Sequence, residues 1–262
     1  DSPMKSLFRR MFQTSSQTPE ITFRCKSELK DILPPPVRAS KAMPEWYKKV
    51  EKRIPGSELS NPSSVKGCVP VLDAVSQGYI IPLWADLHVK VTEQVINEDG
   101  DKALHIWFKF PNGSDFGVYE PIGSHAWEQV GEACDLKKFE LGRVLMKFGN
   151  PWTIETPKGW SVYFKNPANN WSNDIELIEA VVDTDEYKSK VNLPYVWKGS
   201  ELGEWVIPKG TPLAQVIPFK SIETKMSIKE EDEDKVNEIH YKMGTLMNDK
   251  YRKLFWHKAK KS

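Results

Sequence analysis

Two aspartates and a tyrosine that follow an apolar run are the residues in this sequence best placed to do chemistry. The run IEAVV leads into Asp183, and Asp185 and Tyr187 occupy the next alternate positions. If a strand continues to that point, side chains two residues apart share a face, so the two carboxylates project together. Paired carboxylates can bind Mg²⁺ through water or orient an attacking water, and the tyrosine ring can stack on a ligand. The alternative is a solvated turn, where aspartate is common because its side chain bonds to the local backbone.

A second candidate site is the aromatic and amide-rich stretch that ends at Trp171. Its polar members are Lys165, Asn166, Asn169 and Asn170. Aromatic rings can stack on a base or a sugar while amides hydrogen-bond its edge. The alternation of Trp160, Val162 and Phe164 indicates instead the inward face of a strand. We interpret Trp160 and Phe164 as core residues, and both interpretations stay open for Trp171 and the asparagines, which fall in a loop.

The sequence lacks the short motifs of common hydrolases and nucleotide-binding enzymes. It contains no GxSxG, HExxH, GxxxxGK[ST] or GxGxxG pattern. None of the five histidines pairs with another at metal-ligand spacing, and we interpret His125 and Glu128 as a solvated surface pair. We therefore assign no metal site.

The elements that must position these residues are predicted to be short strands. From Gly78 onward, runs rich in Val, Ile, Trp, Tyr and Phe are separated by Pro, Gly and Asn, with no alternation of strands and helices. This pattern is typical of an antiparallel sandwich or barrel. The Asp99-Gly100 pair predicts a tight hairpin turn, which would put His105 opposite Glu93 or Gln94. Pro44 predicts the first turn of a short helix, PEWYKKV.

The two ends of the sequence differ from this β-rich part. We expect a flexible N-terminal segment over residues 1–20, a single β-rich domain over 21–222 and a helical segment over 223–262. In that last segment Val236, Ile239 and Met243 share one helical face, and acidic residues gather at its start, as the helix dipole favours. The helix can pack on its own domain or mediate contact between copies of the chain.

Composition restricts the partners. The 37 basic and 36 acidic residues give a net charge of +1, so nothing in the charge balance favours generalised nucleic-acid or membrane binding. No apolar run approaches the roughly 20 residues that span a bilayer, so we expect no membrane span. The three cysteines are odd in number and widely spaced, which is typical of reduced thiols in a cytoplasmic protein.

Four segments resemble, in order, segments of the dUTPase and dCTP deaminase superfamily: PLWADLHVKV, TPKGWSVYFKNPANN, IEAVVDTDEYKSKVNLPY and VIPKGTPLAQVI. The resemblance implies a barrel fold that assembles as a trimer. It implies that Asp183 is a water-orienting carboxylate and Tyr187 a stacking ring. Asp86 and Gln215 match an acidic and a glutamine position of that family, and Lys165 and Asn166 stand where it carries a phosphate-binding Arg-Ser. We find no counterpart of its Gly-rich terminal arm, which closes over the nucleotide.

The chain between Phe23 and Phe219 is also similar to an uncharacterised protein family of marine T4-like phages, cyanophages in particular. The segments that carry this similarity are MPEWYKK, GYIIPLWAD, NPWTIETPKGWSVYFKNP, VVDTD and IPKGTPLAQVIPF. The resemblance implies a phage-encoded protein located in the host cytoplasm or the virion. It implies no activity.

We therefore predict a mainly β protein, a distorted antiparallel barrel or sandwich with an N-terminal extension and a C-terminal helix. We expect a non-catalytic binding or structural protein that forms a homo-oligomer, a trimer by the resemblance. Its small-molecule or protein ligand would dock near Asp86, the Asn166–Asn170 loop and Asp183–Tyr187. The predicted ligand-binding residues are Asp86, Lys165, Asn166, Asn169, Asp185, Tyr187 and Gln215. The alternative is a nucleotide pyrophosphatase related to dUTPase, with Asp183 as its catalytic residue and Mg²⁺ as its cofactor.

Overall fold

Antiparallel pairs of short strands dominate the computed structural model of this protein. It describes residues 18–58, 63–93, 102–109, 122–125, 145–172, 174–199, 201–245 and 250–254. The expectations for residues 1–17, the Asp99-Gly100 turn and Glu128 lie outside these ranges. Every strand pairing in the described part of the chain is antiparallel. The prediction of a mainly β, antiparallel protein is confirmed.

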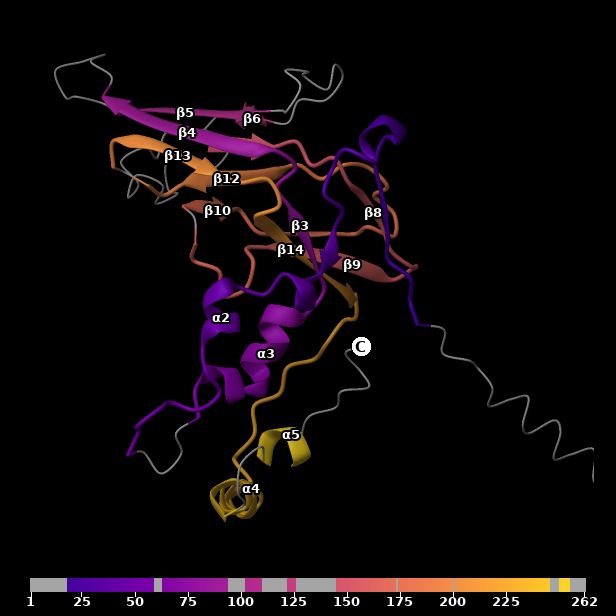
Figure 1. Cartoon of the computed structure of the whole chain (residues 1–262). Coiled ribbons are helices and arrows are strands. Elements are labelled where there is room, and N and C mark those ends of the chain that lie inside the picture. The colour runs from indigo at the N-terminus through magenta and orange to yellow at the C-terminus, as the bar shows by residue number, and fades with distance from the viewer. Residues whose placement is uncertain are drawn as a thin grey trace, which may run out of the picture.

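The described strands form four separate sheets (Figure 1). The largest, in the order β11-β9-β14-β3-β2, contains Ala180–Val182, Trp160–Lys165, Pro212–Lys220, Tyr79–Pro82 and Val37–Arg38. A second, β10-β12-β7-β6, contains Ile175–Leu177, Leu193–Trp197, Leu145–Phe148 and Ile122–His125. The third, β13-β4-β5, contains Gly203–Ile207, Asp86–Glu93 and Lys102–Lys109, and β1 (Thr22–Arg24) pairs with β8 (Thr153–Glu155). Within the described ranges these sheets do not close into a barrel.

The inward faces of the sheets share one apolar core. Trp84, Phe148 and Phe164 are each almost fully buried in it, together with residues from β4, β12 and β14. The rings of Phe148 and Tyr195 stack with their centroids 4.0 Å apart. Tyr195 is fully buried, its hydroxyl has no hydrogen-bond partner among the described residues, and burial raises its pKa above the usual range.

The hairpin of β4 and β5 forms, but in a different register from the predicted one. His105 lies opposite Lys90, and Glu93 lies opposite Lys102. The predicted position of His105 opposite Glu93 or Gln94 is therefore wrong, whereas the turn itself lies outside the described residues. In this register His88 stacks on Trp107, with ring centroids 5.4 Å apart. The register of a hairpin also depends on the pairing of side chains along both faces of its strands, so the Asp99-Gly100 pair alone was not enough to predict it.

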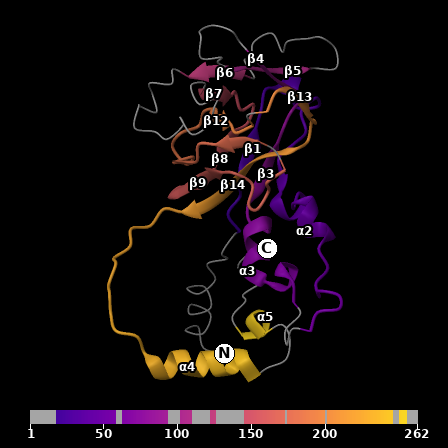
Figure 2. The same cartoon turned by 90° about the vertical axis from the view of Figure 1, so that its left-hand side faces the viewer.

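Helices cover the outer face of the five-stranded sheet near β3 and β14. They are α2 (Glu45–Lys49), which follows Pro44 as predicted, and α3 (Val69–Ser76), and short 3₁₀ turns lie at Ser27–Leu29, Ala39–Lys41 and Val65–Gly67. Both helices lie on the same side of this sheet in the two views (Figures 1 and 2). Gly78 makes the turn from α3 into β3 with a φ of +70°, and a Cβ there would lie 2.2 Å from the Val216 carbonyl oxygen. This turn therefore requires glycine.

The C-terminal part leaves the sheets after β14. An extended segment, residues 221–232, leads to α4 (Glu233–Thr245), and α5 (Lys250–Leu254) lies beside α4. In both views α4 stands apart from the sheets (Figures 1 and 2). Of the two arrangements considered from the sequence, packing of this helix across the sheets is not seen. None of the helices in the described ranges has the length and hydrophobicity that crossing a membrane requires.

The buried hydroxyl of Tyr195 gives a test of the core. We expect Tyr195→Phe to leave the free energy of unfolding unchanged or to raise it by up to about 2 kcal/mol, because the hydroxyl is desolvated without a partner. Tyr195→Ala should lower the free energy of unfolding by about 3–5 kcal/mol, because it removes the stacked ring. Urea denaturation of the three proteins measures both changes. A loss of more than about 1 kcal/mol in Tyr195→Phe would show that the hydroxyl has a stabilising partner.

Candidate functional site

The paired aspartates lie in a turn and not on a continued strand. β11 ends at Val182, and the Asp183 carbonyl oxygen accepts hydrogen bonds from the backbone N–H groups of Glu186 (3.2 Å) and Tyr187 (2.8 Å). Tyr187 is 51% exposed, and its hydroxyl donates to the Lys190 carbonyl at 3.5 Å. The expectation that Asp183 and Asp185 share a strand face depended on a continued strand, and the strand stops before them.

Side chains of this turn hold the start of β9. The Asp183 carboxylate accepts a hydrogen bond from the Ser161 hydroxyl at 2.7 Å. The Asp185 carboxylate accepts one from the Gly159 backbone N–H, also at 2.7 Å. Between them, the buried Thr184 shares a 2.8 Å hydrogen bond with the Thr156 hydroxyl. Each of the three residues thus connects the turn to the segment that leads from β8 into β9.

Asp86 and Gln215 also have partners within the fold. The Asp86 carboxylate accepts a hydrogen bond from the Lys209 backbone N–H at 2.7 Å, which fixes the turn before β14. The fully buried Gln215 amide donates to the carbonyls of Ala74 (3.0 Å) and Gln77 (2.7 Å) at the end of α3. Its oxygen accepts from the Ala168 backbone N–H at 2.8 Å. Gln215 therefore joins α3, β14 and the loop that follows β9.

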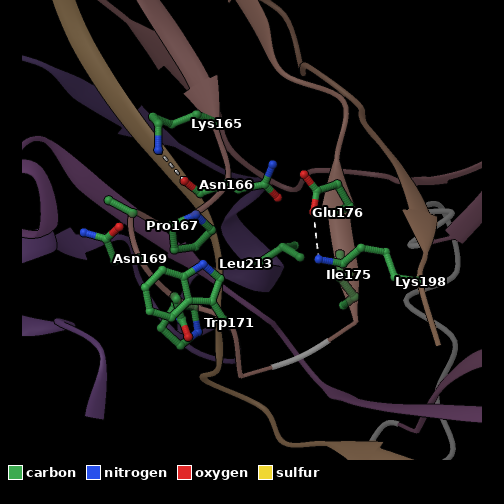
Figure 3. A pocket seen from close by; sticks show the side chains of 12 residues that line it. Lys165, Asn166, Pro167, Asn169, Trp171, Ile175, Glu176, Lys198 and Leu213 are labelled. Atoms are coloured by element: carbon green, nitrogen blue, oxygen red, sulfur yellow. Dashed lines mark hydrogen bonds and ion pairs between the residues drawn. The ribbon is translucent and has the colours of Figure 1, made fainter. Parts of the chain in front are cut away.

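A pocket lies beside that loop, at the far end of β9 from Asp183 (Figure 3). Its volume is about 190 Å³. Its walls come from the loop, from β10, from the residue after β12 and from the start of β14. The lining residues are Lys165, Asn166, Pro167, Ala168, Asn169, Asn170, Trp171, Ile175, Glu176, Lys198, Pro212 and Leu213.

Hydrogen bonds to three different elements fix the loop. The Asn166 side chain pairs with the backbone of Leu177, donating to its carbonyl at 3.1 Å and accepting from its N–H at 2.8 Å. The Trp46 indole N–H, from α2, donates to the Asn169 carbonyl at 2.7 Å. Asn169 itself has a φ of +54°, a conformation that asparagine tolerates better than most residues. Together with the hydrogen bond from Ala168 to Gln215, these contacts fix the conformation of the loop in the protein alone.

An exposed tryptophan stands at the edge of the pocket. Trp171 stacks on Trp46 with ring centroids 5.5 Å apart and an angle of 16° between the planes. Although Trp46 covers part of it, Trp171 remains 73% exposed. A large aromatic side chain exposed on a fixed loop beside a pocket offers a flat surface on which a ligand ring can stack.

The charged groups of the pocket already have partners. The Lys198 ammonium lies 2.8 Å from the Glu176 carboxylate, and the Lys165 ammonium donates to the Asn166 carbonyl at 2.6 Å (Figure 3). Next to the pocket, hydrogen bonds from Tyr163 and Asn166 hold the pKa of Glu179 below its usual value, although burial acts in the opposite direction. The lining is therefore polar, with one ion pair, Glu176 and Lys198, and the further basic side chain Lys165.

The structure separates the residues that the sequence analysis grouped as one docking region. Lys165, Asn166 and Asn169 line the pocket, and Gln215 supports it from behind. Asp183, Asp185 and Tyr187 lie at the opposite end of β9, and Asp86 lies on another sheet. Among the described residues, no three His, Cys, Asp or Glu side chains are close enough to hold a metal ion.

Several pocket residues, among them Glu176, Lys198 and Leu213, were not predicted from the sequence, and neither was the contact between Trp46 and Trp171. Only PEWYKKV, as a predicted helix with an aromatic pair, gave a signal for Trp46. Comparison with known proteins adds no further residue: no protein-family model matches this chain, and no similar sequence is found among curated proteins.

Proposed function

We propose that this protein is a non-catalytic binding protein that holds a ring-bearing ligand in the pocket beside Trp171. The observation that supports it best is an indole left 73% exposed on a loop already fixed by Trp46 and Gln215. A fixed loop loses little conformational freedom on binding, so stacking and hydrogen bonds contribute more of their strength to affinity. From the sequence resemblance we further propose a phage origin, with the host cytoplasm or the virion as the location.

The contacts of the aspartates support the absence of catalysis. Asp183 and Asp185 each accept a hydrogen bond from the segment that begins β9, and Asp86 accepts one from the turn before β14. These bonds account for the presence of the carboxylates without a reaction. The pocket and Asp183 also lie at opposite ends of β9, so a ligand on Trp171 would not place a reacting bond next to Asp183.

The second candidate is a nucleotide pyrophosphatase that acts with Mg²⁺. The sequence resemblance favours it, as does the exposure of Asp183 and Tyr187 on the same turn. In this function Asp183 would orient the attacking water and Tyr187 would stack on the base. Mg²⁺ would neutralise the charge of the phosphates.

Turnover distinguishes the two functions. We expect no release of phosphate or pyrophosphate when the protein is incubated with Mg²⁺ and each of the common ribo- and deoxyribonucleoside triphosphates. The measurement is a coupled phosphate assay with and without inorganic pyrophosphatase. Asp183→Asn and Asp185→Asn serve as a matched pair, because both remove one carboxylate from the same turn. Turnover that is lost in Asp183→Asn and kept in Asp185→Asn would overturn the non-catalytic proposal.

We also propose that the C-terminal part joins copies of this chain into a homo-oligomer. The segment before α4 leaves Met226 and Ile228 each 88% exposed, and α4 stands apart from the sheets (Figure 2). Glu230 to Asp234 form an acidic run that leads into α4, whereas exposed Lys49 and Arg53 lie on and after α2. Opposite charges of this kind favour docking of the helical segment of one copy against the α2 side of another.

A charge placed on the apolar face of α4 tests this association. We expect Ile239→Asp to lower the molar mass measured by light scattering toward that of the monomer, because it puts a charge on the apolar face of α4, which the contact would bury. Asn237→Asp adds the same charge on a different face of α4 and should leave the molar mass unchanged. If the number of chains per particle stays the same in Ile239→Asp, or in a chain truncated after Ser227, the proposal is contradicted.

A further inference from the structure

We infer that the ligand of the pocket is a saccharide, an uncharged ring rich in hydroxyl groups that lies against Trp171. This inference rests on the proposed binding function and names its ligand class. It depends on three properties of the pocket: the exposed surface of the Trp171 indole, the ion pair of Glu176 with Lys198, and the mixture of hydrogen-bond donors and acceptors among the lining residues.

The indole offers a flat apolar surface for a ring. Trp46 supports one side of Trp171 in a near-parallel stack, and 73% of Trp171 stays in solvent. Figure 3 shows the indole alongside Pro167 and Asn169 at the pocket. The carbon-bound hydrogens on one face of a sugar ring form an apolar surface that an aromatic face can cover, and a base could stack in the same place.

The ion pair of Glu176 and Lys198 favours the uncharged ring over a nucleotide. Two cations line the pocket: Lys198 pairs with the Glu176 carboxylate at 2.8 Å, and Lys165 donates to the backbone carbonyl of Asn166 at 2.6 Å. A phosphate would have to displace the Glu176 carboxylate from Lys198 and would then lie close to it, which is unfavourable for two anions. An uncharged ligand leaves the pair of Glu176 and Lys198 intact.

The polar groups match hydroxyl groups, each of which donates and accepts a hydrogen bond. Glu176 can accept, Lys198 can donate, and the side-chain amide of Asn169 can do both, whereas the Asn170 amide oxygen already accepts from Ser172 and leaves its NH₂ group to donate. A carboxylate or an amide has two polar atoms, so one such side chain can form hydrogen bonds with two neighbouring hydroxyls of a sugar ring. The volume of about 190 Å³ is below that of most drug-sized sites, so the pocket would hold one sugar unit and leave the rest of a chain outside.

Binding measurements on the full chain test this inference. The probes are uncharged sugars (glucose, galactose, mannose, N-acetylglucosamine and their common disaccharides), the charged sugar N-acetylneuraminic acid, and the nucleoside triphosphates. Calorimetry and saturation-transfer NMR report binding at concentrations up to about 10 mM. We expect at least one uncharged sugar to bind, and we expect Trp171→Ala to weaken that binding about tenfold or more, because it removes the stacking surface.

Two further variants make the result specific to the pocket. Trp107→Ala removes another exposed tryptophan, on β5 in a different sheet, and should leave the affinity unchanged. Glu176→Gln keeps the shape of the side chain but frees Lys198, and it should shift the preference toward N-acetylneuraminic acid and the nucleotides. Thermal melting of each variant shows whether a loss of binding is a loss of folding.

Each outcome has a definite meaning. Binding of an uncharged sugar that requires Trp171 supports the inference. Binding of a nucleotide or of N-acetylneuraminic acid that requires Trp171, with no uncharged sugar bound, overturns the ligand class and leaves the binding function standing. If no probe binds in a way that depends on Trp171 while the variants remain folded, both the ligand class and the proposed use of the pocket are wrong.

Discussion

The hydrogen bonds of one buried amide, Gln215, hold the arrangement on which the candidate site depends. The last carbonyls of a helix have no partner within the helix. Here the side-chain NH₂ group of Gln215 donates to the carbonyls of Ala74 and Gln77, at the end of α3. Its oxygen accepts from Ala168, so the same side chain fixes the loop that carries Trp171. A buried polar group left unpaired costs about 1–3 kcal/mol, so these three parts are strongly constrained to stay together.

The order of strands in the large sheet explains where the site lies. β14 is central, and β9 pairs with it along its length, so Lys165 lies opposite Gln215. The chain leaves β9 at that point, beside the end of α3 and within reach of Trp46 on α2. The loop therefore meets helices on one side and β10 on the other. The apolar core stabilises the fold without Trp171. The loop keeps its shape while it exposes the indole, because the backbone groups of Ala168 and Asn169 are hydrogen-bonded to Gln215 and Trp46.

The sequence predicted the local features of this fold better than its long-range contacts. Alternating apolar residues identified the strands, and Pro44 marked the start of α2, because both signals depend on neighbours in the chain. The hairpin register was misjudged from the Asp99-Gly100 pair, since pairing depends on side chains on two strands. The stack of Trp46 on Trp171 joins residues far apart in the chain, and no pattern in either segment specifies it. Lys165, Asn166 and Asn169 were predicted as ligand-binding residues, yet the reason for their grouping is the contact with Gln215.

The residues that carry the resemblance to the dUTPase-like proteins have structural contacts here. Asp86 fixes the turn before β14, Asp183 fixes the start of β9, and Gln215 joins the sheet to α3. A carboxylate that accepts a backbone N–H or a hydroxyl at a strand end contributes to folding whether or not it takes part in a reaction. These contacts account for the three residues whether or not the chain catalyses a reaction. Trp171 has its stack on Trp46 as a structural contact, yet 73% of the residue remains exposed. For that reason function is better sought at Trp171 than at the aspartates.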